Sequence, residues 1–249
     1  MPHLTIEYYF LFCTALLVVA FLYSSVGHGG ASGYLALMIL FSFSISAMKI
    51  NALVLNCFVA GISFLFFTKA KKIKLNLFYP FAITSIPGSF LGGYLDFNED
   101  FIKGILGVIL LFSIIYINGF LNKKAIELKP IRLPFALFIG FLIGLLSGMI
   151  GIGGGVILTP LLLILGWATI IEAASVSALF IFVNSVAGIL GYFAKGNSFE
   201  WLMFSMIPFA ILGGLLGSYI GSRFFSNKQL RYVLSFIVLL ASIKLIFSE

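Results

Sequence analysis

Two long apolar stretches dominate the pattern of hydrophobic and polar positions along the chain. No Asp, Glu, Lys or Arg occurs from Tyr8 to Met48 or from Leu133 to Ile171. Each stretch is about twice the roughly 20 residues that one helical membrane crossing needs, and glycines interrupt each near its middle. Because continuously apolar runs do not alternate as barrel strands do, the pattern predicts an all-α polytopic membrane protein with about ten membrane segments. Beyond the two stretches, segments are predicted at 50–69, 75–95, 103–121, 173–194, 200–223 and 230–247.

Composition excludes a soluble fold. The 249 residues are 61% hydrophobic and 9% charged, with a mean hydropathy of +1.18, whereas soluble domains carry about 25% charged residues. The net charge of +7 comes from lysines and arginines in short loops, which indicates cytoplasmic loops and not a nucleic-acid-binding surface. We expect one transmembrane domain over residues 1–249 in the cell membrane, with the bilayer as its surroundings and homo-oligomerisation left open. Cys13 and Cys57 lie in apolar runs and are predicted to be buried free thiols.

The second segment of each long stretch is short, so it is either a steep crossing or a re-entrant segment. If all ten segments cross, most basic residues fall on one side, and both termini lie outside the cytoplasm. This arrangement obeys the positive-inside rule better than the re-entrant one, and we take it as the expectation.

The chain repeats itself with an offset of about 124–128 residues. Gly27–Gly30 matches Gly151–Gly154, and Gly88–Tyr94 matches Gly213–Tyr219. Loops at equivalent places carry opposite charge, which is expected of two five-segment halves inserted in opposite directions, as in many secondary transporters. The predicted division is repeat 1 at about 8–121, a basic linker at 122–132 and repeat 2 at about 132–248.

The glycine motifs carry a family resemblance. Ser24–Gly30 (SSVGHGG), Ser147–Gly155 (SGMIGIGGG) and Ala173–Leu179 (AASVSAL) resemble the TauE/SafE family of membrane permeases, also called sulfite exporters. The resemblance covers nearly the whole chain, although the first half departs with His28 in the motif and Ala31 where the second half has Gly155. It implies transport of sulfite, organosulfonates or related small anions, often outward, without fixing the ligand.

Consecutive glycines at a helix end can turn several backbone N–H groups toward an oxyanion, and helix N-terminal dipoles add to the attraction. His28 is the single ionisable group between Tyr8 and Met48, so it is a candidate anion ligand or proton relay. Neutral donors one segment later, Asn51 and Ser177, can hold an anion without a buried charge. The alternatives are tight turns, close packing and interhelical hydrogen bonds, and Asn56, Ser175 and Asn184 are weaker candidates. The predicted substrate-binding residues are Gly27, His28, Gly29, Gly30, Asn51, Gly151, Gly153, Gly154, Gly155 and Ser177.

Two further glycine stripes, 140/144/148 and 213/217/221, repeat every four residues. Such a spacing of small residues is typical of close helix packing in membranes. We therefore predict that these glycines hold helices together and do not bind ligand.

The residues predict a secondary transporter that exports a small anion by alternating access, with sulfite or an organosulfonate as the expected substrate. The two glycine breaks should then face one another across a central cavity. An anion-selective channel using the same motifs is the alternative, and a non-transporting scaffold is a third class. Enzyme chemistry is excluded by inventory, because His3 and His28 are the two histidines of the chain and no zinc or nucleotide motif occurs. No cofactor and no metal site is expected.

Overall fold

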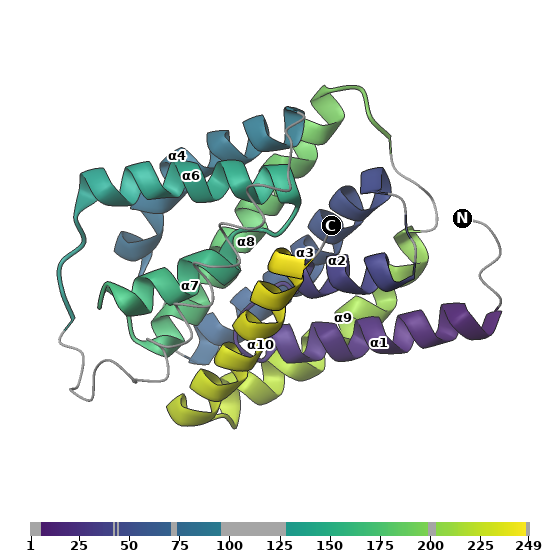
Figure 1. Ribbon diagram of the computed structural model, residues 1–249. Helices are drawn as coiled ribbons and strands as arrows, with labels where there is room; N and C mark the ends of the chain where they lie inside the picture. The colour runs from purple at the N-terminus through teal and green to yellow at the C-terminus, as the bar shows by residue number, and fades with distance from the viewer. Residues whose placement is uncertain are drawn as a thin grey trace.

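The computed structural model describes residues 6–41, 43, 45–70, 74–95, 128–198 and 203–247 (Figure 1). All regular structure in these residues is α-helical, which confirms the predicted all-α class. The predicted segment 103–121 lies outside the described residues, as does most of the predicted linker 122–132. The described helices are α1 (Ile6–Ser24), α2 (Ala31–Leu40), α3 (Ile45–Ala70), α4 (Leu75–Tyr94), α6 (Leu133–Ile150), α7 (Gly155–Ile164), α8 (Ile170–Ala194), α9 (Met203–Arg223) and α10 (Asn227–Phe247).

Five of the described helices are long and apolar enough to cross a membrane. They contain the stretches Glu7–Ser24, Ala47–Lys69, Leu133–Ile150, Ile170–Ala194 and Phe204–Arg223. Their outward faces carry large exposed apolar side chains, including Leu11, Leu65 and Phe138. Lipid tails would cover such faces, so the fold is that of a multi-pass membrane protein.

The helices α2 and α7 are shorter than a membrane crossing needs. Each is ten residues long, about 15 Å at 1.5 Å per residue, which is half of the roughly 30 Å hydrocarbon layer. The following helices begin earlier than predicted, at Ile45 and Ile170, and take up the remaining apolar residues. For α8 the cause is local, because Thr169 and Glu172 form a capping box at its first turn. The half-span arrangement left open by the sequence therefore fits α2 and α7.

The two parts of the chain interleave. Helix α4 packs mainly on α6 and α8, and α9 packs mainly on α1 and α3, while α3 and α8 pack on one another between these groups (Figure 1). The sequence repeat matches α4 with α9, α6 with α1 and α8 with α3. The contacts of α4 with α6 and α8 therefore have counterparts in the contacts of α9 with α1 and α3.

Glycines let the backbones of these helices approach closely. A β-carbon at Gly144 or Gly148 of α6 would meet the backbone of α4 at Ser85 or Ser89. The stripe on α9 meets α1 in the same way, with Gly217 against the carbonyl of Phe21. The predicted packing role of both glycine stripes is therefore confirmed.

The positions of these approaches are also matched. Gly88 of α4 faces the carbonyl of Phe141, and Gly213 of α9 faces the carbonyl of Leu17. Gly88 precedes Gly213 by 125 positions and Leu17 precedes Phe141 by 124. The offset found in the sequence thus reappears as equivalent contacts in the fold.

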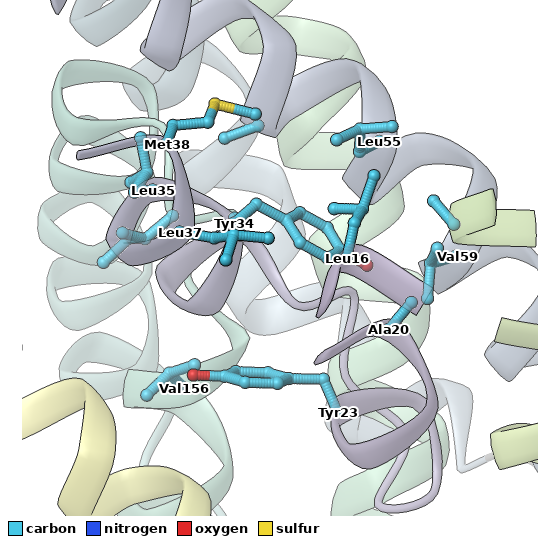
Figure 2. Packing of buried hydrophobic residues seen from close by; sticks show 14 of the residues in the cluster. Leu16, Ala20, Tyr23, Tyr34, Leu35, Leu37, Met38, Leu55, Val59 and Val156 are labelled. Atoms are coloured by element: carbon cyan, nitrogen blue, oxygen red, sulfur yellow. The ribbon is translucent and has the colours of Figure 1, made fainter. Parts of the chain in front are cut away.

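A buried cluster surrounds the connection between α1 and α2. Figure 2 shows side chains of α1, α2 and α3 gathered around Tyr34, with the ring of Tyr23 reaching toward Val156 of α7. The free thiol of Cys13 lies in this core and is buried as predicted, while Cys57 is also free but only partly buried. This packing holds the first glycine break inside the protein and not on its surface.

Candidate functional site

Two glycine breaks, Gly27–Gly30 between α1 and α2 and Gly151–Gly154 between α6 and α7, have similar turns at their first and last glycines, although Gly153 has a positive φ and its counterpart Gly29 does not. Gly27 and Gly151 have φ angles of 80° and 84°, and Gly30 and Gly154 have 100° and 75°. Residues with a β-carbon rarely adopt this left-handed region, so glycine is required at these matched positions. In the second break Gly151 also ends α6, where its N–H donates to the carbonyl of Ser147 at 2.9 Å.

The two breaks meet at one pair of side chains. A β-carbon built on Gly29 would contact the carboxamide oxygen of Asn56, and one on Gly153 would contact its nitrogen. The same two β-carbon positions lie 3.1 and 2.8 Å from Cγ2 of Ile181. Asn56 on α3 and Ile181 on α8 therefore lie between the breaks, and the fold brings the two motifs together. A cavity between them stays a prediction.

Tyr34 binds the backbone of the first break through two hydrogen bonds. Its hydroxyl donates to the carbonyl of Gly29 at 2.6 Å, and its backbone N–H donates to the carbonyl of Gly30 at 2.9 Å. The side chain is fully buried. Both carbonyl oxygens are thereby already satisfied.

In the second break, the carbonyl oxygen of Gly154 accepts hydrogen bonds from the first turn of α7. The carbonyl of Gly154 accepts from the N–H groups of Ile157 and Leu158 at 3.1 and 3.0 Å. The carbonyl of Gly155 faces Nε2 of His28 at 3.1 Å. At each helix N-terminus, then, two carbonyl oxygens of the turn have hydrogen-bond partners.

Some backbone N–H groups of the breaks, unlike the carbonyl oxygens just described, have no hydrogen-bond partner. Within the described part of the chain, the N–H groups of Gly29 and Gly153 donate to no acceptor. Unpaired N–H groups at a helix N-terminus carry a partial positive charge and suit an anion. In each break, one backbone donor is therefore without a partner among the described residues.

His28 links the first break to the second half of the chain. Its Nδ1 lies 3.2 Å from the carbonyl of Val26, and its Nε2 lies 3.1 Å from both the carbonyl of Gly155 and Oγ1 of Thr159. Thr159 donates to Oγ of Ser177 at 2.6 Å, so its own oxygen is left to accept from Nε2–H. Each ring nitrogen therefore faces an acceptor, and the geometry accommodates a doubly protonated imidazole.

Three buried side chains beside the breaks, those of Asn56, Ser185 and Ser147, each have a polar atom without a partner among the described residues. Oδ1 of Asn56 accepts from the N–H of Ala31 at 3.0 Å, which fixes the orientation of the carboxamide and turns Nδ2 toward Gly153. Among the described residues, Nδ2 of Asn56 and Oγ of Ser185 find no hydrogen-bond partner. Ser185 Oγ lies 3.3 Å from the β-carbon position of Gly153, and both side chains are fully buried. Orphaned groups of this kind are rare in folded proteins and point to a ligand.

Other predicted residues lie elsewhere or act differently. Gly27 packs on the carbonyl of Ala174 and Gly151 on the carbonyl of Lys49, so these two glycines serve helix packing as well as the turn. Asn51 is buried, and no hydrogen bond to another described residue reaches its Oδ1 or joins it to His28. Its assignment to the site remains a prediction.

Reasoning from the sequence did not consider Thr159 and ranked Asn56 below Asn51, although the structure places Asn56 between the two breaks. Thr159 is the one polar side chain of α7 and lies four residues, or about one turn, after Gly155. A hydroxyl at that spacing in an apolar helix is a usable signal. Asn56 gave no such signal, because only the packing of α3 between the breaks shows where its carboxamide lies.

The fold is that of a multi-pass membrane protein, with long apolar helices and two glycine breaks that meet at a buried polar side chain. Together with the relatives of the chain, these features define a membrane transporter. A probable membrane transporter protein of Sinorhizobium fredii, y4hK, is 38% identical over 93% of this chain and 96% of its own length. Two probable membrane transporter proteins of Bacillus subtilis, YjnA and YunE, are 28% and 25% identical over 92% and 79% of this chain, and over 96% and 79% of their own lengths. No solved structure gives a significant match.

The family follows from a match to residues 11–245. That match is to the family described as Sulfite exporter TauE/SafE. Because it covers almost the whole chain, the protein belongs to this family, which is one of membrane transporters and not of enzymes.

Proposed function

We propose that the protein is a secondary transporter that exports a small anion, sulfite or an organosulfonate, by alternating access between its two halves. The observation that carries the proposal is the meeting of both glycine breaks at Asn56 and Ile181. Donors without partners converge there in a buried setting, and neutral donors bind an anion without the cost of burying a lone cation.

The matched contacts support two equivalent halves of opposite orientation. Gly93 packs on Gly188 of α8, and Ser218, at the position that matches Gly93, forms a hydrogen bond of 2.9 Å with Ser63 of α3. Together with the matched approaches of α4 and α9, this favours an inverted repeat around the α3–α8 pair. Substrate sites of such transporters lie where the repeats meet.

Alternating access would use the contacts between the halves. His28 of the first half contacts Gly155 and Thr159 of the second, and these hydrogen bonds would break and re-form as the halves rock. Outward movement of an anion is already favoured by an inside-negative potential, by about 2.3 kcal/mol per charge per 100 mV. Export therefore needs no coupling ion on energetic grounds, and His28 is the proposed relay if a proton is coupled.

Counterflow in liposomes tests the proposal. Purified protein is reconstituted with unlabelled sulfite inside, and uptake of labelled sulfite or taurine is followed with and without the internal anion. A carrier gives saturable uptake that the internal anion accelerates. A channel gives conductance without such exchange, and absence of any anion flux in protein shown to be folded would refute transport altogether.

A further inference from the structure

The polar groups at the meeting point of the two breaks both donate and accept hydrogen bonds. Nδ2 of Asn56 and Oγ of Ser185 lie within 3.3 Å of the same point, the β-carbon position of Gly153. Each side chain is fully buried, and neither of these atoms has a hydrogen-bond partner among the described residues. A carboxamide nitrogen donates, whereas a hydroxyl both donates and accepts. One small ligand can therefore bind both groups.

An apolar side chain lies at the same place. Cγ2 of Ile181 is 3.1 Å from the β-carbon position of Gly29 and 2.8 Å from that of Gly153, and the side chain is buried. An oxygen placed against this aliphatic group finds no hydrogen bond there, while a methyl or methylene group gains free energy by burial. A ligand that combines oxygens with a carbon group fits both kinds of contact.

The charges near the meeting point are few. Among the described residues, no charged side chain bonds to the two unpartnered polar atoms. Lys49 packs on Gly151, but its ammonium donates to the carbonyl of Gly92 on α4 at 3.1 Å, and Nε2 of His28 faces the carbonyl of Gly155. The desolvation cost of a buried ion rises with the square of its charge, so a second negative charge costs more than the first. These surroundings favour a singly charged ligand.

From these contacts we infer that Asn56, Ser185 and Ile181 are substrate-binding residues that select singly charged oxyanions over dianions, with an organosulfonate preferred. The sulfonate oxygens accept from the carboxamide of Asn56 and the hydroxyl of Ser185, and the carbon group lies against Ile181. Sulfite binds in its singly charged hydrogensulfite form, whose proton the hydroxyl of Ser185 accepts. The inference rests on the proposed function and narrows its substrate class.

Two ions of one shape test the selectivity without any substitution. Methanesulfonate and sulfate are both tetrahedral, and a methyl group in the first replaces a charged oxygen in the second. Each is used to compete with labelled sulfite in counterflow at constant ionic strength. Methanesulfonate should compete about tenfold more strongly than sulfate. Equal competition, or stronger competition by sulfate, would overturn the inference.

A pair of substitutions isolates the carbon contact. Ile181→Thr and Ile181→Val leave side chains of the same shape, and the first has a hydroxyl where the second has a methyl group. The preference for methanesulfonate over sulfate should be about fourfold smaller in Ile181→Thr than in Ile181→Val protein. The same preference in both folded variants would contradict the role of Ile181.

Two further substitutions test the polar contacts. Asn56→Asp keeps an acceptor for the N–H of Ala31 but replaces the unpartnered nitrogen by an oxygen, so methanesulfonate should compete about tenfold less well. Ser185→Ala removes one hydroxyl, should weaken competition by about fivefold, and covers the case in which Asn56→Asp does not fold. The control is Ser63→Ala on α3, equally buried but hydrogen-bonded to Ser218, which should leave affinity unchanged.

The outcomes separate this inference from the proposed function. Wild-type affinity in folded Asn56→Asp or Ser185→Ala protein would show that the substituted group binds buried water and not the substrate, and would refute the site assignment. The proposed function would survive that result, because counterflow of sulfite would persist. A folded wild-type protein that moves no anion would refute both.

Discussion

Matched glycines begin and end the two breaks with similar turns, yet the side chains around them differ. His28 of the first break corresponds to Ile152 of the second, and Tyr34 after the first break corresponds to Leu158 after the second. The hydrogen bonds of His28 and Tyr34 therefore have no counterpart across the pair. Glycine positions preserve the turns of each half, while the polar and apolar side chains around the breaks are distributed differently in the two halves.

The same contrast holds on the neighbouring helices. Asn56 on α3 stands opposite Ile181 on α8, and both touch the two breaks. Thr159 of α7, which bonds to His28 and Ser177, corresponds to Leu35 of α2. A transporter with equivalent halves can thus keep a symmetric mechanism of rocking and still present an asymmetric surface to its substrate.

The largest expected effect concerns the symmetric part of the comparison. Gly92→Ala of α4 and Gly217→Ala of α9, at matched positions, each place a methyl group against the backbone of a neighbouring helix, at the matched carbonyls of Leu145 and Phe21. Because backbone cannot move aside as a side chain can, each substitution should cost about 1–3 kcal/mol of stability. Thermal unfolding and the yield of monodisperse protein measure the effect.

Gly61→Ala is the control for this pair. A β-carbon there meets only the ring of Phe182 at 3.5 Å, an ordinary contact, so stability should be unchanged or slightly raised. Equal effects at Gly92 and Gly217 support equivalent halves. A loss at one of the two positions alone would contradict the equivalence.

The next effect separates a binding glycine from a packing glycine. Gly153→Ala combines a φ of 72° with a clash at the Asn56 carboxamide, so it should weaken anion affinity by about tenfold. Gly29→Ala meets the same carboxamide without a positive φ and should weaken affinity less. Competition against labelled sulfite measures both.

Gly196→Ala controls for backbone strain. Its φ is 90°, but nothing lies within 4 Å of its β-carbon position. It should lower stability by about 1 kcal/mol and leave anion affinity unchanged. Normal affinity in well-folded Gly153→Ala protein would exclude the second break from the site.

A smaller effect tests the polar closure of the first break. Tyr34→Phe removes the hydroxyl that donates to the carbonyl of Gly29 and leaves that buried acceptor without its partner. The expected loss is about 1 kcal/mol, measured as a lower melting temperature. Tyr79→Phe on the exposed face of α4 should have no effect. A Tyr34→Phe protein as stable as the wild type would show that the hydroxyl of Tyr34 does not stabilise the first break, and that the two breaks do not differ in this stabilising contact.

The smallest effect concerns coupling. His28 faces the carbonyls of Val26 and Gly155 and the hydroxyl of Thr159, so its ring can hold a proton at each nitrogen. If a proton is coupled, transport by the wild type should vary between pH 5 and 8, and His28→Gln should remove that variation. Counterflow rates across this range measure it. A pH dependence that persists in His28→Gln protein would exclude His28 as the relay.

The pattern of apolar and polar positions determined much of the fold. Length and continuity of apolar runs placed the described helices to within a few residues at most ends, because a membrane helix satisfies its backbone within its own segment. The glycine motifs marked both breaks, since a left-handed turn depends on residues that are adjacent in the chain. The repeat offset likewise predicted which contacts would be equivalent.

Tertiary structure alone decided the rest. The half-length of α2 and α7 depends on where α3 and α8 begin, and a capping box at Thr169 sets one of these starts. The interleaving of α4 and α9 with the opposite part of the chain is invisible locally, because a glycine does not reveal which backbone it will meet. For the same reason Asn56 looked like one amide among several, and only the packing of α3 against both breaks placed its unpaired nitrogen beside Gly153.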